Sequence, residues 1–401
     1  MRPATIAKAL LLASAAAVGL AVSQQETYDA LSARLERESW VPPYFAGRVP
    51  IFDPRQHEPL VAAMRQEPFE EVRAGRYAYR TSPARIELGR RLFETYDWGT
   101  AETWRPAQRY TWYSLGLTTA EELQARYGVR VRPDGTLLGL TGIVAQDGKT
   151  DYGWTCAMCH GTLDSEGRVV LGSPNHKLAY GLMHHRALVT HPSRPGAPGP
   201  GFIDKDTPLA DLISLGPGRI DMNGDRRVNA VKIPSLWGLR SLRSGIFANG
   251  SIGNIWMGIP HNGGPFPASD LIEAVVAYVL SLEPPPNPAA AAPAAVRGRK
   301  VFEGAGCASC HAGGDYTNGE VIPLPVIGTD PSRAAVEFPK GYKVPSLRRL
   351  DLQQMFLHDG SVDALALLFS KERLNRIKGH EYGLDLAPKE KDDLVAFLLS
   401  L

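Results

Sequence analysis

The feature that most constrains this chain is a five-residue pattern that contains all four of its cysteines. The pattern Cys-x-x-Cys-His occurs twice, at residues 156–160 (CAMCH) and 307–311 (CASCH). It is the attachment pattern of a c-type haem, in which two thiols tether the haem and the adjacent histidine lies beside the iron. The sequence therefore predicts two covalent haems. The expected ligands are Cys156, Cys159 and His160 at the first site and Cys307, Cys310 and His311 at the second.

Two other uses of these cysteines must be weighed. An exported chain with four cysteines can form two disulfides, and paired cysteines also bind zinc. Neither use explains why a histidine directly follows each pair, and so haem attachment is favoured.

The first 23 residues have the pattern of a signal peptide. Arg2 and Lys8 precede an apolar run over 9–22, and Ala21-Val22-Ser23 is a small-x-small cleavage site. The run is shorter than the ~20 residues that span a bilayer. We expect cleavage after Ser23 and a periplasmic or otherwise extracytoplasmic mature chain with no membrane span.

The overall composition is that of a globular protein without a strong charge bias. Lys plus Arg is 44 and Asp plus Glu is 42, which leaves a net charge of +2. This balance gives no reason to expect a nucleic acid partner. The 40 glycines and 32 prolines predict a loop-rich fold.

Several segments recur along the chain in the same order. The matching pairs are 86–93 with 296–302, 232–236 (KIPSL) with 343–347 (KVPSL), 247–251 with 357–361, and 274–282 with 393–401. The period is too long for a solenoid repeat, and so it indicates duplication of a whole domain. A Pro/Ala-rich stretch at 284–295 reads as a semi-rigid linker between the two copies.

These patterns predict a mainly α fold with two cytochrome c-type haem domains related by duplication. The fold should be loop-rich, with an irregular N-terminal extension. The expected divisions are a signal peptide (1–23), the extension (24–81), a first domain with insertions (82–283), the linker (284–295) and a second domain (296–401). Ser82-Pro83 should begin a helix, and Asp134-Gly135 should form a hairpin turn.

The sequence resembles the dihaem cytochromes c related to bacterial cytochrome c peroxidases, MauG-type enzymes and rubber-oxygenase-type proteins. The resemblance rests on "GRRLF…CAMCH", "VNAVKIPSLWGLRSLRSGIFANGS", "GRKVF…CASCH…KVPSLRRLDLQQMFLHDGS" and the closing "GHEYGLDLAPKEKDDLVAFLLSL". It covers residues 82–401 apart from 98–150. It implies two α-helical cytochrome c domains whose haems face the seam between them.

The sixth ligand of each iron decides whether a haem only carries electrons or can also bind a substrate. His380 stands 21 residues before Leu401, and His261 stands the same 21 residues before Leu282. No other histidine outside the Cys-x-x-Cys-His motifs repeats in this way, because His358 aligns with an alanine. We therefore assign His380 to the second iron and His261 to the first.

Two rivals remain open for the first iron. Met257 lies four residues before His261, and methionine is the other usual sixth ligand. His176 lies in the region where the resemblance to the peroxidases implies a removable distal histidine.

The sequence also departs from the peroxidase pattern. Glu372 stands where that pattern has a methionine ligand, which argues against a Met-ligated second haem. The resemblance implies an inter-domain calcium with an asparagine such as Asn229. Gln353 and Met355 replace its other two partners, and so calcium is doubtful. The stretch 221–225 (DMNGD) has the alternating carboxylates of a calcium loop but reads more simply as a turn.

Two classes of function follow. The favoured one is an electron-transfer protein whose partners are other periplasmic redox proteins. The alternative is a dihaem peroxidase or oxygenase, with the first haem open to peroxide or dioxygen. The enzyme would need an acid near the open face, for which Asp270 and Glu273 are the nearest candidates.

Overall fold

A computed structural model gives the fold of most of the chain. It describes residues 28–74, 77–97, 109, 112–113, 115–144, 148–183, 213–220, 230–242, 269–331 and 341–401. Several sequence predictions fall outside these residues. They are the signal peptide, the repeat segment 247–251, the stretch 221–225, Asn229, Met257 and His261.

The N-terminal extension has regular structure, and so the expectation of an irregular segment is wrong. Its elements are α2 (Tyr28–Arg37), η1 (Pro43–Phe45), β1 (Ile51–Phe52), η2 (Pro54–Gln56), α3 (Glu58–Gln66), β2 (Glu70–Ala74) and β3 (Tyr77–Thr81). Several prolines of this segment begin helical turns, as at Pro43, Pro54 and in the first turn of α3. Proline suits these positions because the first helical N–H groups have no intrahelical partner.

The first unit continues with small sheets between two long helices. Its elements are α4 (Pro83–Thr95), α7 (Ala120–Tyr127), β4 (Leu140–Val144), β5 (Thr150–Trp154), α8 (Ala157–His160), β6 (Gly161–Leu163), β7 (Val169–Leu171), β8 (Arg219–Ile220), β9 (Val231–Lys232), η3 (Leu239–Ser241) and α12 (Ser269–Ser281). The predicted start of α4 is confirmed, because the Ser82 side chain accepts a bond from the Arg85 N–H. The predicted turn is confirmed by the bridge between Val131 and Leu137, with Gly135 at φ +81°.

The second unit is smaller and more helical. Its elements are η4 (Pro288–Ala291), α13 (Pro293–Gly304), η5 (Cys307–Ser309), β10 (Val321–Pro323), α14 (Leu324–Ile327), β11 (Gly341–Lys343), η6 (Leu350–Leu352), α16 (Leu365–Leu368), η7 (Glu372–Asn375) and α17 (Pro388–Leu398). Helix α13 begins inside the predicted linker. Asn287 Nδ2 donates to Leu399 O (2.8 Å) and Arg349 Nη1 donates to Pro285 O (2.7 Å), so the linker is packed onto this unit.

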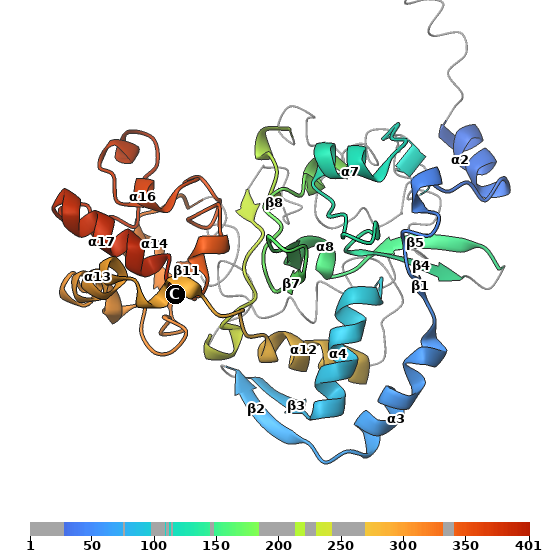
Figure 1. Ribbon diagram of the computed structural model, residues 1–401, viewed down its shortest axis with the longest axis horizontal. Helices are drawn as coiled ribbons and strands as arrows, with labels where there is room; N and C mark the ends of the chain where they lie inside the picture. Colours follow the sequence, from blue (N-terminus) through green and yellow to red (C-terminus); the bar gives the residue numbers. More distant parts are fainter. Residues whose placement is uncertain are drawn as a thin grey trace, which may run out of the picture.

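Each unit contains a pair of helices that pack across one another. Helix α4 crosses α12 in the first unit, and α13 crosses α17 at the other end of the molecule (Figure 1). Both crossings need a glycine, because a Cβ at Gly89 would overlap the backbone of Ala274 and one at Gly298 would overlap the backbone of Asp393. Among the described helices, none combines the length and apolar character needed to cross a membrane.

A separate core joins the N-terminal extension to the first Cys-x-x-Cys-His motif. Phe45 from η1, Trp112 and Leu123 of α7 pack in one buried cluster with Met158 from within the motif. Gly139, at φ +87°, passes so close to Met158 that no side chain fits there. The extension and the insertion between α4 and α8 therefore bury the Met158 side of the first Cys-x-x-Cys-His motif.

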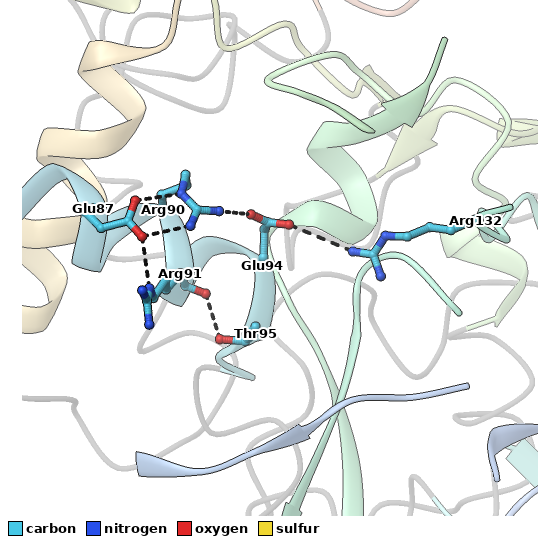
Figure 2. A network of polar contacts seen from close by, with 6 residues as sticks. All are labelled: Glu87, Arg90, Arg91, Glu94, Thr95 and Arg132. Carbon is cyan, nitrogen blue, oxygen red and sulfur yellow. Dashed lines mark hydrogen bonds and ion pairs between the residues drawn. The ribbon is translucent and has the colours of Figure 1, made fainter. Parts of the chain in front are cut away.

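The outer face of α4 carries an ion-pair network (Figure 2). Arg90 bonds Glu87 and Glu94 at 2.8 Å, and Glu94 reaches Arg132 at 3.9 Å. The Arg90 guanidinium, together with Arg91, lowers the pKa of Glu87 to about 2. This network links α4 to the 131–137 turn and leaves the opposite face of the helix to pack on α12.

Candidate haem sites

None of the four cysteines forms a disulfide in the structure. Cys156 caps the start of the single turn of α8 and Cys159 lies within it. Cys307 begins the turn η5 and Cys310 directly follows it. The disulfide alternative is therefore not realised. Each pair of thiols is held on one short helical turn beside its histidine.

The histidine of each motif is oriented by a backbone carbonyl. His160 Nδ1 lies 3.1 Å from Pro234 O, and His311 Nδ1 lies 3.0 Å from Tyr316 O. A carbonyl only accepts, so Nδ1 carries the proton and Nε2 keeps its lone pair, as a metal ligand requires. Burial lowers the pKa of His160 to about 4 and also lowers that of His311, which keeps both rings neutral.

A cavity of about 240 Å³ is lined mostly by the second unit, and residues of the first unit complete its wall. Its lining is mostly apolar and includes Cys307, Cys310 and His311 on one side and His380 from a following loop. Leucine and phenylalanine side chains supply much of the remainder. An apolar cavity with two thiols and two imidazoles is the donor set that a covalent haem needs.

The two imidazoles in this cavity lie at the separation expected for a shared metal ion. Two rings that bind one metal from opposite sides have centres about 6.3 Å apart, given a metal–nitrogen bond of about 2.0–2.1 Å and about 1.1 Å from nitrogen to ring centre. The centres of His311 and His380 are 6.4 Å apart, with the planes inclined at 58°. The residues present therefore fit a haem with two histidine ligands.

The loop around His380 is tightly fixed. His380 has φ +47°, an unusual value for a residue with a side chain, and its N–H donates to Ile327 O at 2.8 Å. The buried guanidinium of Arg373 donates to the carbonyls of Leu368 (2.9 Å), Ile377 (3.0 Å) and His380 (2.8 Å). His380 Nδ1 is buried with no hydrogen-bond partner among the described residues. Burial, followed by the charge of His311, lowers the pKa of His380 to about 4.

We expect Arg373→Met to loosen the second site without touching a ligand. The variant loses three buried hydrogen bonds that hold the His380 loop, each worth about 1–3 kcal/mol when a charged donor is removed. A fraction of the second haem should become high-spin in electron paramagnetic resonance. Arg376→Met, an exposed arginine three residues away, is the control and should leave the spectrum unchanged. Identical spectra for both variants would show that Arg373 does not position His380.

His358 lines the same cavity in a different role. Its ring stacks on Tyr342, with centres 4.0 Å apart and planes inclined at 23°. Its carbonyl accepts a bond from the Lys232 N–H at 3.0 Å. His358 thus lies in the seam between the two units beside the site.

His176 lies behind the first motif histidine rather than across a haem from it. The Gln354 N–H donates to His176 Nδ1 at 3.0 Å, so this nitrogen carries no proton and Nε2 of the neutral ring carries it. A protonated Nε2 cannot bind iron. The backbone of Ile233 lies beside the same ring, next to the Pro234 carbonyl that holds His160. In this structure His176 is therefore a buried hydrogen-bond acceptor on the proximal side of the first site.

The two acids considered for an enzyme are held in ion pairs. Glu273 Oε2 lies 2.7 Å from Arg80 and 3.2 Å from Arg85, and Asp270 Oδ2 lies 2.8 Å from Arg65. These pairs fix α12 to α3, β3 and α4. Neither carboxylate is placed as a free acid.

The two second-unit residues considered for calcium, Gln353 and Met355, bond a lysine of the first unit. Lys232 Nζ donates to Met355 O at 2.8 Å and lies 3.3 Å from Gln353 Oε1. Within the described parts of the chain, no group of three or more His, Cys, Asp or Glu side chains could hold a metal ion. Lys232, the first residue of the repeated KIPSL segment, is a seam residue that its sequence pattern alone did not predict.

Comparison with known proteins gives only distant structural neighbours. No family model matches the chain, and no curated protein matches it. A MauG-like protein associated with microbial copper homeostasis shares 17% identity over 84% of this chain and 94% of its own, with a TM-score of 0.33. The diheme peroxidase BthA of Burkholderia thailandensis shares 16% identity over 82% of this chain and 88% of its own, with a TM-score of 0.29.

A third neighbour is the hydrazine synthase of Kuenenia stuttgartiensis. It shares 19% identity over 43% of this chain and 73% of its own, with a TM-score of 0.33. The first two neighbours are a MauG-like protein and a diheme peroxidase, two of the classes that the sequence resembles.

Proposed function

We propose that this chain is an exported dihaem c-type cytochrome that carries electrons between periplasmic redox partners. Its haems are tethered by Cys156 and Cys159 at one site and by Cys307 and Cys310 at the other. The observation that carries the proposal is the 6.4 Å separation of the His311 and His380 rings across the second cavity. Both axial positions of that iron are then filled by protein, which suits electron transfer rather than substrate binding.

Equivalent details in the two units support descent from one duplicated cytochrome domain. Gly89 and Gly298 occupy the same place in the two helix crossings. Gly238 and Arg349 follow the two PSL segments by the same interval, and both have positive φ, of +76° and +52°. Short antiparallel strand pairs precede the PSL segment in each unit. These matches extend beyond the residues that showed the repeat in the sequence.

The side chains of each site would set the ligands and the surroundings of its haem. A bound haem would supply one-electron iron chemistry. His160 and His311 are kept neutral by burial and are aimed by Nδ1–H bonds to carbonyls. His380 closes the second site, and its loop is fixed by Arg373. The surrounding leucine and phenylalanine side chains exclude water, which lowers the reorganisation that accompanies a change of charge.

The two sites are joined through one residue of the first unit. Pro234 lines the second cavity, and its carbonyl accepts the Nδ1–H bond of His160. A single backbone segment therefore contacts the second haem site and holds the axial ligand of the first. This arrangement supports electron exchange between the two haems inside one molecule.

The haem content tests the proposal directly. Protein matured in a periplasm should retain two haems per chain after acid–acetone extraction, because each haem is bonded to two cysteines. Cys307→Ala should reduce attachment chiefly at the second site, leaving about one haem per chain by mass spectrometry. Cys156→Ala is the matched variant for the first site. Fewer than two haems in the parent protein would contradict the proposal.

The enzyme alternative depends on the first haem. It requires that iron to be open to peroxide or dioxygen, with a proton donor nearby. The described acids Asp270 and Glu273 are ion-paired, and His176 lies on the proximal side, so none of these residues supports it. The predicted ligand His261 lies outside the described residues, and its assignment remains part of the electron-carrier proposal.

A further inference from the structure

The second cavity has an unusual charge for so apolar a site. Its described lining includes two lysines, Lys232 and Lys343, and no aspartate, glutamate or arginine. Lys232 belongs to β9 of the first unit and Lys343 to β11 of the second. They are the same position of the repeated segment, as the first residue of KIPSL and of KVPSL.

Burial disfavours the charged form of both lysine side chains. Burial lowers the pKa of Lys232 to about 8 and that of Lys343 to about 7, where the charge of Lys232 is the second cause. Lys232 Nζ uses two of its three N–H groups on Met355 O and Gln353 Oε1. Neither acceptor carries a charge. The charge of Asp359 partly offsets the burial of Lys232, but Asp359 does not line the cavity. Two like charges in a buried apolar site are stabilised further when anions lie beside them.

We propose that Lys232 and Lys343 bind the two propionate carboxylates of the second haem. The inference rests on the proposed function, since it needs a haem in this cavity. A haem brings two carboxylates into a site that offers two cations, and so the charges balance. Both side chains line the cavity that would hold the haem, so each ammonium group would lie within the site that receives the propionates.

The arrangement makes the second haem a shared ligand of both units. Each unit supplies one lysine from the same repeat position, yet both lysines line one cavity. The first unit therefore contributes to the affinity and the redox potential of the second haem. Nearby positive charge favours the ferrous state, because reduction adds a negative charge to the site.

The test uses the full-length haem-loaded protein. Lys232→Met and Lys343→Met keep the length and apolar stem of the side chain and remove its charge. Each variant should shift the second haem's redox equilibrium about tenfold toward the ferric form, which is about 59 mV lower for a one-electron couple. A propionate that has lost its lysine can also take up a proton, which would reduce the shift in potential. In that case a protonated carboxyl signal should appear in the redox-difference infrared spectrum. Lys232→Arg should retain the parent behaviour, and Lys300→Met, an exposed lysine on α13, is the control.

The parent protein provides a second measurement that requires no variant. Its redox-difference infrared spectrum should contain signals of ionised haem carboxylates from the second site and none of protonated ones. Haem content is measured in every sample, so that absence of the second haem from the parent protein is scored against the proposed function. The lysine inference is overturned if the haem is present and both Met variants keep the parent potential and infrared spectrum. Protonated carboxyl signals in the parent would overturn it as well.

Discussion

Replacing His380 with alanine should convert essentially all of the second haem from low-spin to high-spin ferric iron. The variant removes the imidazole whose ring centre lies 6.4 Å from that of His311, and no other described histidine faces His311 in this way. The vacated position should bind carbon monoxide in the reduced protein. The potential of that haem should rise, because an imidazole stabilises ferric iron more than a weaker ligand does. Electron paramagnetic resonance and carbon monoxide difference spectra measure both effects.

The matched control is His358→Ala in the same cavity. His358 stacks on Tyr342 and is assigned no bond to iron, so its loss should leave the second haem low-spin. A high-spin signal in His358→Ala together with an unchanged His380→Ala spectrum would reverse the two assignments.

Gly298→Ala should destabilise the second unit strongly. A Cβ at this position would overlap the Asp393 carbonyl of α17 and lie 2.8 Å from Phe397 Cβ. The helices would have to separate, and overpacking of this kind costs about 1–3 kcal/mol or more. For a unit of this size, a loss of about 2 kcal/mol lowers the melting temperature by roughly 10 °C. Thermal unfolding followed by circular dichroism measures the change.

Gly304→Ala provides a control in the same helix. Gly304 ends α13, and a Cβ there meets nothing within 4 Å. Alanine is favoured over glycine in a helix by up to about 1 kcal/mol. Gly304→Ala should therefore melt at or above the parent temperature. A melting temperature for Gly298→Ala equal to that of Gly304→Ala would mean that α13 and α17 do not cross at this glycine.

Local patterns with a direct physical cause could be predicted from the sequence. Ser82-Pro83 combines a capping hydroxyl with a residue suited to the first helical position, and α4 begins there. The Asp134-Gly135 turn needs a positive φ that glycine supplies. The Cys-x-x-Cys-His pattern identified both motif histidines because the spacing itself sets the chemistry.

Other features depend on contacts between distant residues and could not be predicted in this way. The prolines of residues 42–59 suggested irregular structure, whereas the fold places several of them at the start of helical turns. The role of His176 depends on an N–H group 178 residues away, at Gln354. Lys232 and Lys343 were visible as a repeat, but only the fold shows that both line one cavity.

The most direct test of the electron-carrier account is electron paramagnetic resonance of the ferric parent protein with two haems per chain. The account predicts low-spin signals from both haems and no high-spin signal, with His261→Ala converting only the first haem to high-spin. A high-spin signal from the first haem of the parent protein would contradict the account and favour an enzyme that binds peroxide or dioxygen there.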